Sequence, residues 1–286
     1  MQIIERIEPL RVALEEPRRG GKPIALVPTM GALHEGHLAL VDRARDRAAC
    51  VVMSLFVNPL QFGPNEDFAR YPRDRAGDAR LADARGVDIL FAPQPDELYR
   101  GGRAITVVPT ALASRWDGAA RPGHFTGVLT VVAKLFNIVQ PDIAVFGQKD
   151  FQQATLIRAM VRDLDFPIQI VVSPTVREKD GVALSSRNSY LNAPDRKRAR
   201  VLSRAIFAMR DAFDGGEASI AKLEALGNVV AAAEPAVMVE YLAVMDPKTL
   251  EPAPVAIAGS IVAIAARVGR TRLIDNIILG APDPTG

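Results

Sequence analysis

The amino-acid sequence predicts an α/β protein: a Rossmann-like open parallel sheet with helices on both faces, followed by a smaller α+β domain. Short apolar runs alternate with amphipathic stretches over the first 175 or so residues, as they do in parallel sheets covered by helices. After Arg187 two helical stretches come first and strands follow them, which indicates a separate domain. The chain of 286 residues is 49% hydrophobic and 24% charged, which suits two unequal globular domains.

The elements of the first domain, residues 1–175, follow from the spacing of apolar residues. Residues 36–48 repeat apolar positions at Leu38, Val41 and Ala44, as an amphipathic helix does. Gly86 is a natural stop for the helix before it. We expect strands at 24–29, 50–57, 87–93, 143–147 and 168–175, and helices at 36–48, 75–86, 126–139 and 151–164.

The second domain, residues 176–286, is expected to cover the active site. The segment 58–73 is a further candidate cover, because long loops rich in Asn, Pro and Gly in compact domains are often functional. The last residues, 281–286, are expected to fray. Helices are expected at 194–213 and 218–233, and strands at 238–246, 260–269 and 272–279.

Charge and cysteine content exclude several classes of protein. The 35 basic and 33 acidic residues are spread along the chain, and a net charge of +2 gives no long-range attraction to nucleic acid. The single cysteine, Cys50, excludes an intrachain disulfide. The first residues lack the features of a signal peptide, and no apolar run approaches the ~20 residues of a membrane span. We therefore expect a cytoplasmic protein with neither a nucleic-acid nor a membrane partner.

The segment PTMGALHEGH, residues 28–37, joins a predicted buried strand to a predicted helix. In open parallel sheets, ligands bind beyond the carboxyl ends of the strands. A helix N-terminus at that place offers unpaired N–H groups and a partial positive charge to an anion. His34 and His37 are three residues apart, so they can share one face of the first turn and donate to phosphate oxygens.

Three alternatives compete for this segment. The histidines are one residue too close for the zinc motif H-E-x-x-H, and one cysteine with three histidines in the whole chain argues against a closed zinc site. Either histidine alone fits a structural helix cap. The chain contains neither G-x-G-x-x-G nor G-x-x-x-x-G-K-[ST], which excludes the dinucleotide and P-loop signatures.

Two later segments also offer groups for phosphate. Residues 147–150, Gly-Gln-Lys-Asp, directly follow a predicted strand, and Lys149 is a compact cation suited to phosphate. In isolation, a surface ion pair between Lys149 and Asp150 is the better interpretation. Residues 185–187, Ser-Ser-Arg, supply two hydroxyls and a guanidinium for polyphosphate oxygens, although the same sequence fits an ordinary turn.

Five blocks, in order and at matching spacing, resemble the pantothenate synthetase family (pantoate–β-alanine ligases). The H-x-G-H of the first block is the signature of the wider nucleotidyltransferase superfamily, and the other blocks narrow the resemblance to this family. The blocks are LVPTMGALHEGHLALV, SLFVNPLQFGPNEDFARYPR, RPGHFTGVLTVVAKLFNIVQPD, FGQKDFQQ and PTVREKDGVALSSRNSYL, within residues 26–191.

This resemblance implies an ATP-dependent, AMP-forming ligase of pantothenate biosynthesis, on the route to coenzyme A. Pantoate and ATP would form pantoyl adenylate and pyrophosphate, and β-alanine would then displace AMP to give pantothenate. ATP and Mg²⁺ are the implied cofactors, and a homodimer is the implied assembly. For His37 the family suggests proton donation; we favour charge stabilisation, because pyrophosphate is a good leaving group.

The resemblance also implies the site residues of this chain. Pantoate would contact Met30, Gln61, Gln153 and His124, and β-alanine would contact Gln61 and Asn58. The implied catalytic residues are His34, His37, Lys149, Ser185, Ser186 and Arg187. The implied ATP-binding residues are Met30, Gly31, Ala32, Leu33, His34, Glu35, Gly36, His37, Gly147, Gln148, Lys149, Asp150, Val176, Leu184, Ser185, Ser186 and Arg187.

The chain departs from the family pattern where relatives often carry two adjacent acidic residues near the magnesium. Here the pair is Gly77 and Asp78. We therefore assign no protein ligand to Mg²⁺, with Asp78 the one candidate, and expect ATP phosphates and water to hold the ion.

Three other functions remain open. A nucleotidyltransferase that leaves AMP or CMP on a phosphorylated substrate would share H-x-G-H but need a phosphate site in place of Gln61 and Gln153. A non-catalytic nucleotide-binding module would lose one of the polar site residues. An RNA-binding relative of the tRNA synthetases would require a basic surface, which the charge balance does not support.

Overall fold

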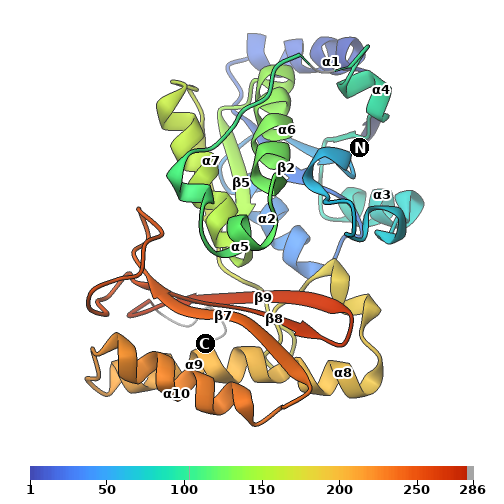
Figure 1. Ribbon diagram of the computed structural model, residues 1–286. Coiled ribbons are helices and arrows are strands. Elements are labelled where there is room, and N and C mark those ends of the chain that lie inside the picture. Colours follow the sequence, from blue (N-terminus) through green and yellow to red (C-terminus); the bar gives the residue numbers. More distant parts are fainter. Residues whose placement is uncertain (103, 282–286) are drawn as a thin grey trace. The chain divides into compact units, whose positions relative to one another are not determined.

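The computed structural model describes residues 1–102 and 104–281, which group into two compact units (Figure 1). The larger unit comprises Met1–Ser114, Gly118–Gly147 and Leu156–Ser173; the smaller comprises Arg115–Asp117, Gln148–Thr155 and the chain from Pro174 onward. The two short segments belong to the smaller unit because they contact strands of its sheet: the rings of Trp116 and Tyr241 have centroids 5.4 Å apart, and Asn276 Nδ2 donates to Lys149 O at 2.8 Å. The functional roles expected for domains 1–175 and 176–286 stay predictions.

A six-stranded parallel sheet forms the centre of the larger unit, as predicted, in the order β1-β4-β3-β2-β5-β6. The chain moves from β2 through β3 to β4 on one side and from β5 to β6 on the other. The order therefore reverses between β2 and β5, and ligands of open parallel sheets bind beyond the carboxyl ends of the strands at such a point. The strands are β1 (Gln2–Ile4), β2 (Ile24–Thr29), β3 (Cys50–Leu55), β4 (Ile89–Phe91), β5 (Ile143–Gly147) and β6 (Gln169–Ser173).

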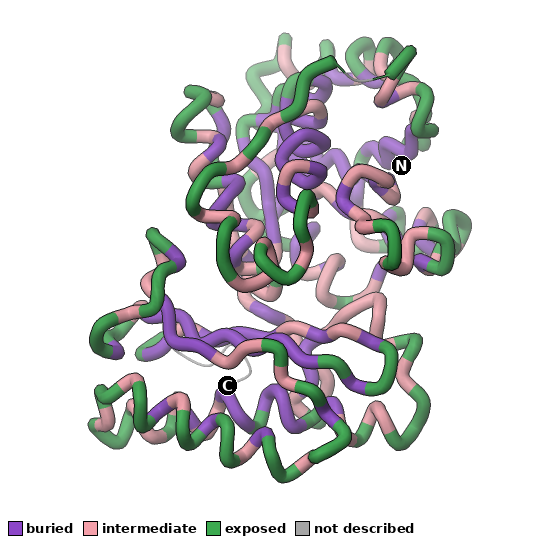
Figure 2. The backbone as a smooth tube through the Cα atoms, viewed as in Figure 1, coloured by how far each residue is buried: buried purple, intermediate pink, exposed green. Residues whose placement is uncertain are grey.

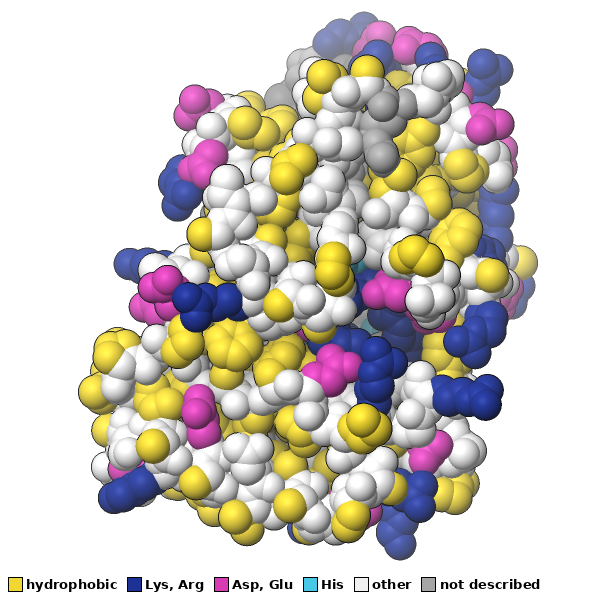
Figure 3. All heavy atoms as spheres, viewed as in Figure 1, with side chains coloured by type: hydrophobic (Ala, Val, Ile, Leu, Met, Phe, Trp, Pro, Cys, Tyr) yellow, Lys and Arg dark blue, Asp and Glu magenta, His cyan; other side chains and the backbone are white. Residues whose placement is uncertain are grey.

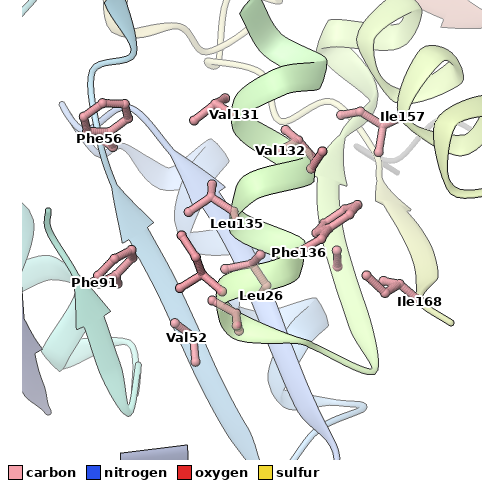
Figure 4. Close-up of a cluster of buried hydrophobic side chains, with 14 of the residues drawn as sticks. Leu26, Val52, Phe56, Phe91, Val131, Val132, Leu135, Phe136, Ile157 and Ile168 are labelled. Atoms are coloured by element: carbon pink, nitrogen blue, oxygen red, sulfur yellow. The ribbon is translucent and has the colours of Figure 1, made fainter. Parts of the chain in front are cut away.

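Alternation along the strands distributes their side chains between two cores. From β2, Ile24 and Leu26 enter one core, and Ala25 and Val27 enter the other. Figure 4 shows the first core, where Leu26 of β2 lies close to Leu135 and other side chains of one helix. The first core is closed by α1 (Ile7–Arg19), α6 (His124–Val139) and α7 (Phe151–Asp163), and the second by α2 (Glu35–Arg45) and α3 (Arg75–Ala84).

Helix α6 is almost wholly buried (Figure 2), because apolar residues cover nearly its entire surface. Near its start, Gly127 approaches the 3-10 turn η1 (Pro59–Gln61) so closely that a Cβ atom would lie 2.2 Å from Leu60 O. A rigid, buried helix thus sets the position of the segment that carries Gln61. Two short helices, α4 (Pro95–Leu98) and α5 (Trp116–Ala120), and the 3-10 turns η2 (Phe68–Arg70) and η3 (Ala111–Ala113) lie in the connections.

The smaller unit contains a three-stranded antiparallel sheet in the order β7-β8-β9. Alternate residues of the central strand, such as Val262 and Ile264, pack against Leu202, Ile206 and Met209 of the helices that cover one face. The strands are β7 (Val237–Met245), β8 (Ile261–Val268) and β9 (Thr271–Ile278), and the helices are α8 (Ala193–Arg198), α9 (Arg200–Asp214) and α10 (Ile220–Ala232).

The structure differs from the sequence predictions mainly at the ends of elements. β1 and α1 lie within residues 1–23, where we predict no element, and the predicted helix 194–213 is divided into α8 and α9 at Ala199. Some predicted strands are too long, for example 50–57. β3 ends at Leu55, where its pairing with β2 ends, although the next residue, Phe56, is also buried. Because apolar residues continue beyond the paired ones, a prediction from apolar residues places the end of the strand too late. From residue 282, the end expected to fray lies outside the described residues.

Acidic and basic side chains are interspersed on the viewed face of each unit (Figure 3). None of the helices within residues 1–102 and 104–281 combines the length and apolar character needed to cross a bilayer.

Replacement of Gly127 by alanine tests the contact between α6 and η1. Alanine has the higher helix propensity by about 1 kcal/mol, but its Cβ would lie within 2.6 Å of Leu60 O, Leu60 C and Gln61 N. These are backbone atoms, so the collision outweighs the propensity gain, and we expect a net loss of about 1–3 kcal/mol in the free energy of unfolding in urea. Gly63→Ala is the matched control, because its Cβ would meet only the Glu66 side chain, at ordinary contact distances of 3.6 Å or more. Equal stability of the two variants would contradict this contact.

Candidate active site

The loop after β2 makes a tight turn at the carboxyl edge of the sheet. Gly31 has φ +91° and Ala32 has φ +52°, so two successive residues adopt the left-handed region. A Cβ atom at Gly31 would also lie 2.9 Å from both Asp78 Oδ2 and Leu55 Cδ1. The position therefore requires glycine for its conformation and for the close approach of a carboxylate.

Asp78, on the first turn of α3, holds this turn in place. Its two carboxylate oxygens accept from the backbone N–H groups of Leu33 (2.7 Å) and Ala32 (3.0 Å). The side chain is 3% exposed, and burial raises the pKa of Asp78 above its ordinary value although both hydrogen bonds act in the opposite direction. Asp78 thus faces the backbone of this turn with both oxygens.

Gly77, beside it, has no room for a second acidic side chain in this arrangement. Its N–H donates to Asp74 Oδ1 at the start of α3, and a Cβ at this position would lie 2.2 Å from Asp74 Oδ2. Among the residues that the structure describes, no three His, Cys, Asp or Glu side chains are grouped as metal ligands would be.

His34 and His37 come together at the N-terminus of α2, as the sequence predicts. Their ring centroids lie 4.1 Å apart with the planes tilted by 34°. His34 is the N-cap residue, and its Nδ1 accepts from Gly36 N–H at 3.1 Å. Because Nδ1 is an acceptor, the neutral ring carries its proton on Nε2 and can donate from that atom to an anion. Glu35 lies next to them and pairs with Arg85 at 3.1 Å, which ties α2 to the segment after α3.

Asn58 and Gln61 are buried where the segment 58–73 passes α6. Asn58 is 1% exposed; its Nδ2 donates to Gln61 Oε1 and to Gly127 O, both at 3.1 Å, and its Oδ1 accepts from the Tyr99 hydroxyl at 2.8 Å. Gln61 is 8% exposed, and its Nε2 lies 2.9 Å from Met30 Sδ. The structure thus brings three predicted substrate residues together, and Asn58 sets the orientation of the glutamine amide.

A second network fixes the backbone of Gln61. Gln61 O accepts from His124 Nδ1 at 2.8 Å, and Arg121 Nη1 lies 2.9 Å from His124 Nε2, so the ring is a neutral Nδ1–H tautomer. Arg121 also donates to Glu66 at 2.6 and 2.7 Å. Burial alone would raise the pKa of Glu66, but the hydrogen bond and charge of Arg121 outweigh it, so the pKa is lowered. His124 thus links the Gln61 backbone to Arg121 through its two ring nitrogens.

Lys149 and Ser185 lie together within the smaller unit. With Asn188 they line a cavity of about 10 Å³, room for about one water molecule. Lys149 belongs to the 3-10 turn η4 (Gln148–Asp150), which directly follows Gly147 at the end of β5, and Gln153 lies in the following turn of α7. Lys149 Nζ is 3.9 Å from Asp150 Oδ1, and the aspartate is 49% exposed, so this ion pair is weak.

The segment Val176–Leu184 is a hairpin that ends at the Ser-Ser-Arg sequence. Leu184 N–H donates to Val176 O at 3.0 Å, which places these two predicted residues opposite each other. Ser185 then caps the 3-10 turn η5 (Ser186–Tyr190), with its Oγ accepting from Arg187 N–H at 3.3 Å. Ser186 and Arg187 occupy the first two positions of this turn.

Sequence reasoning missed the residues that hold these loops. Tyr99, Arg121 and Glu66 belong to the Gln61 networks, and Arg177, Asp275 and Asn276 to the loops of the smaller unit. One signal was available: Asp275 and Asn276 interrupt the apolar run RLIDNIIL, and adjacent buried polar residues in a strand need partners.

Comparisons with known proteins identify the family. The family model described as pantoate-beta-alanine ligase matches residues 2–278. Pantothenate synthetase from Heliobacterium modesticaldum is 48% identical over 279 residues, covering 98% of this chain and 99% of that protein. Pantothenate synthetase from Moorella thermoacetica is 50% identical over 283 residues, covering 99% of this chain and 100% of that protein.

Solved structures agree with the sequence relatives. Pantothenate synthetase from Thermus thermophilus is 49% identical, with a TM-score of 0.93 over 97% of this chain and 99% of that one. Pantoate-beta-alanine ligase from Francisella tularensis, complexed with beta-gamma ATP and beta-alanine, is 31% identical, with a TM-score of 0.81 over 99% of both chains. On family match, identity, coverage and fold together, this chain belongs to the pantoate–β-alanine ligase family.

Proposed function

We propose that this chain condenses pantoate with β-alanine at the expense of ATP, through a pantoyl-adenylate intermediate. The observation that carries this proposal is the family match over residues 2–278, with relatives that are about 50% identical over nearly the full chain. The Francisella relative was solved with a nucleotide and β-alanine, which supports the same two substrates here.

In the first step, a pantoate carboxylate oxygen attacks the α-phosphorus of ATP, and the bond to the bridging oxygen of pyrophosphate breaks. No side chain need act as a covalent nucleophile, so the protein contributes position and charge. Residues 30–37, 147–150, 176 and 184–187 are the proposed ATP contacts. His34 Nε2–H, oriented by the Gly36 N–H bond to Nδ1, is suited to donate to a phosphate oxygen.

In the second step, the amine of β-alanine attacks the acyl carbon of the adenylate. The bond to the AMP oxygen breaks, and the nitrogen loses a proton. Met30, Gln61, Gln153 and His124 are the proposed pantoate residues, and Gln61 with Asn58 the proposed β-alanine residues. The mutual hydrogen bond of Asn58 and Gln61 supports this assignment, because it presents a preformed amide donor and acceptor.

Magnesium is proposed as part of the substrate, MgATP, with phosphate and water ligands. The engaged carboxylate of Asp78 and the crowded Gly77 position support this assignment. We also propose a cytoplasmic location and, by resemblance to the family, a homodimeric assembly.

Mass spectrometry of the product provides the direct test. The protein is incubated with MgATP, pantoate and β-alanine, and pantothenate and AMP are expected in equal amounts. A parallel reaction offers phosphopantetheine as the acceptor of AMP. If that reaction proceeds and pantothenate does not form, the protein is a nucleotidyltransferase and the proposal is wrong.

Alanine at His37 or Lys149 is expected to lower pantoate-dependent exchange of pyrophosphate into ATP by at least about 10²-fold, the typical effect of removing a group that stabilises developing charge. Exchange reports the first step alone. Lys222→Ala, a lysine whose side chain is 72% exposed, is the control and should exchange normally. Near-normal exchange in the His37 and Lys149 variants, with circular dichroism unchanged, would refute their assigned roles.

Asp78→Asn tests the carboxylate that holds the nucleotide loop. An amide can accept from only one of the two N–H groups, and its own NH₂ then opposes the other, which costs about 1–3 kcal/mol. We expect the KM for ATP to rise about 5- to 150-fold while α3 stays folded. The control is Asp83→Asn on the same helix, where the carboxylate is 62% exposed. Identical ATP kinetics in the two variants would show that Asp78 does not shape the loop.

A further inference from the structure

Two adjacent polar residues, Asp275 and Asn276, lie in the middle of β9 and are each 3% exposed. The strand is otherwise mostly apolar, and burying a polar side chain is unfavourable unless it is hydrogen-bonded. Successive side chains of a strand point to opposite faces of the sheet, so Asp275 and Asn276 contact different segments of the chain.

Asn276 holds the turn that carries Lys149. Its Nδ2 donates to Gln148 O at 3.0 Å and to Lys149 O at 2.8 Å, and its Oδ1 lies 3.3 Å from Gln148 Nε2. One amide therefore binds two consecutive carbonyl groups of η4. Because the carbonyl of Lys149 is one of them, the position from which the lysine side chain extends depends directly on Asn276.

The contact with two carbonyl oxygens requires an amide side chain at position 276. Two carbonyl oxygens need two N–H donors, and an asparagine supplies both from one nitrogen. In a carboxylate of the same shape, a negative oxygen would replace Nδ2 and face both carbonyl oxygens. It would also lie beside Asp275, which already accepts from Asn276 N–H at 2.8 Å. The arrangement thus distinguishes asparagine from its isostere aspartate.

Asp275 holds the second loop from the same strand. Its oxygens accept from Arg177 Nη1 at 2.6 Å and Nη2 at 2.8 Å, and both side chains are at most 5% exposed. Arg177 also donates to Gly181 O and lies over the Phe207 ring at 4.8 Å. The hairpin that leads to Ser185 is therefore attached to β9 one residue away from the turn of Lys149.

We infer that Asn276 is a positioning residue for Lys149, and that Asp275 and Asn276 together align the two phosphate-binding loops of the smaller unit. Lys149 and Ser185 line one cavity in this structure, which is the alignment these two residues maintain. The inference rests on the proposed function in that Lys149 and the segment that begins at Ser185 contact ATP.

The test is a double-mutant cycle between Asn276→Asp and Lys149→Ala in the full-length chain. Alone, Asn276→Asp is expected to lower kcat for pantoate-dependent pyrophosphate exchange about 10- to 100-fold, because a displacement of about 1 Å has effects of this size. In the Lys149→Ala background, Asn276→Asp should lower kcat by less than about threefold further, because Asn276 acts through the lysine. Asn228→Asp, an exposed asparagine on α10, is the matched control and should exchange like the parent.

A purely structural role predicts a different result. The Asn276→Asp substitution would then lower the free energy of unfolding in urea, leave kcat of the folded fraction unchanged, and give effects in the cycle that add to those of Lys149→Ala. Either additive effects on kcat or a normal kcat for Asn276→Asp overturns the inference. If Asn276→Asp does not fold, the same cycle is measured with Asn276→Ser, which keeps one short hydrogen-bond donor and adds no charge.

Titration calorimetry with MgATP repeats the cycle without turnover and separates this inference from the proposed function. If the parent protein binds MgATP but exchanges no pyrophosphate, the proposed function fails, while coupled losses of affinity at the two positions still support Asn276. If the losses of affinity are additive, the positioning role fails even where exchange is active.

Discussion

The two hydrogen bonds from the Asp78 carboxylate to the backbone of Ala32 and Leu33 are the interaction on which the larger unit's site depends. They hold a turn whose residues adopt positive φ, a conformation that L-residues such as Ala32 rarely take unaided. The start of α2 follows this turn, so its shape determines where His34 and His37 lie. A buried carboxylate on one helix thereby sets the geometry at the N-terminus of another.

The smaller unit applies the same principle with different chemistry. Asn276 binds the carbonyl groups of η4, whereas Asp78 binds the N–H groups of Ala32 and Leu33 in the turn after β2. In both cases a side chain that is 3% exposed belongs to a regular helix or strand and fixes the backbone of a loop. Sites whose supporting residues are locked by packing keep their geometry better than loops left alone. Loop flexibility is thus restricted at the residues where phosphate contacts are proposed.

The sequence predicts the sheet, most helices and the division into two kinds of domain, because these follow from the period of apolar residues. β2 and β5 have the predicted bounds, since turn residues end both strands where their pairing ends. The short β1 could not be recognised, because only three residues pair with β4. The positions of His34, His37 and Lys149 at strand ends are also local features. The partners of Arg121, Glu66 and Asn276 could not be predicted, because they lie up to 128 residues away along the chain.

The burial of Asp78 carries an energetic cost, because it removes a charged carboxylate from water. Desolvation raises its pKa even though two N–H groups stabilise the charged form, so the carboxylate is less stable there than in water. A small apolar residue at position 78 would avoid that penalty but would leave the two N–H groups without their acceptor. Asp78 is therefore explained by the shape of the loop rather than by overall stability. The same reasoning applies to Asp275 and Arg177, where a buried ion pair adds little net stability but orients a hairpin that ends at Ser185.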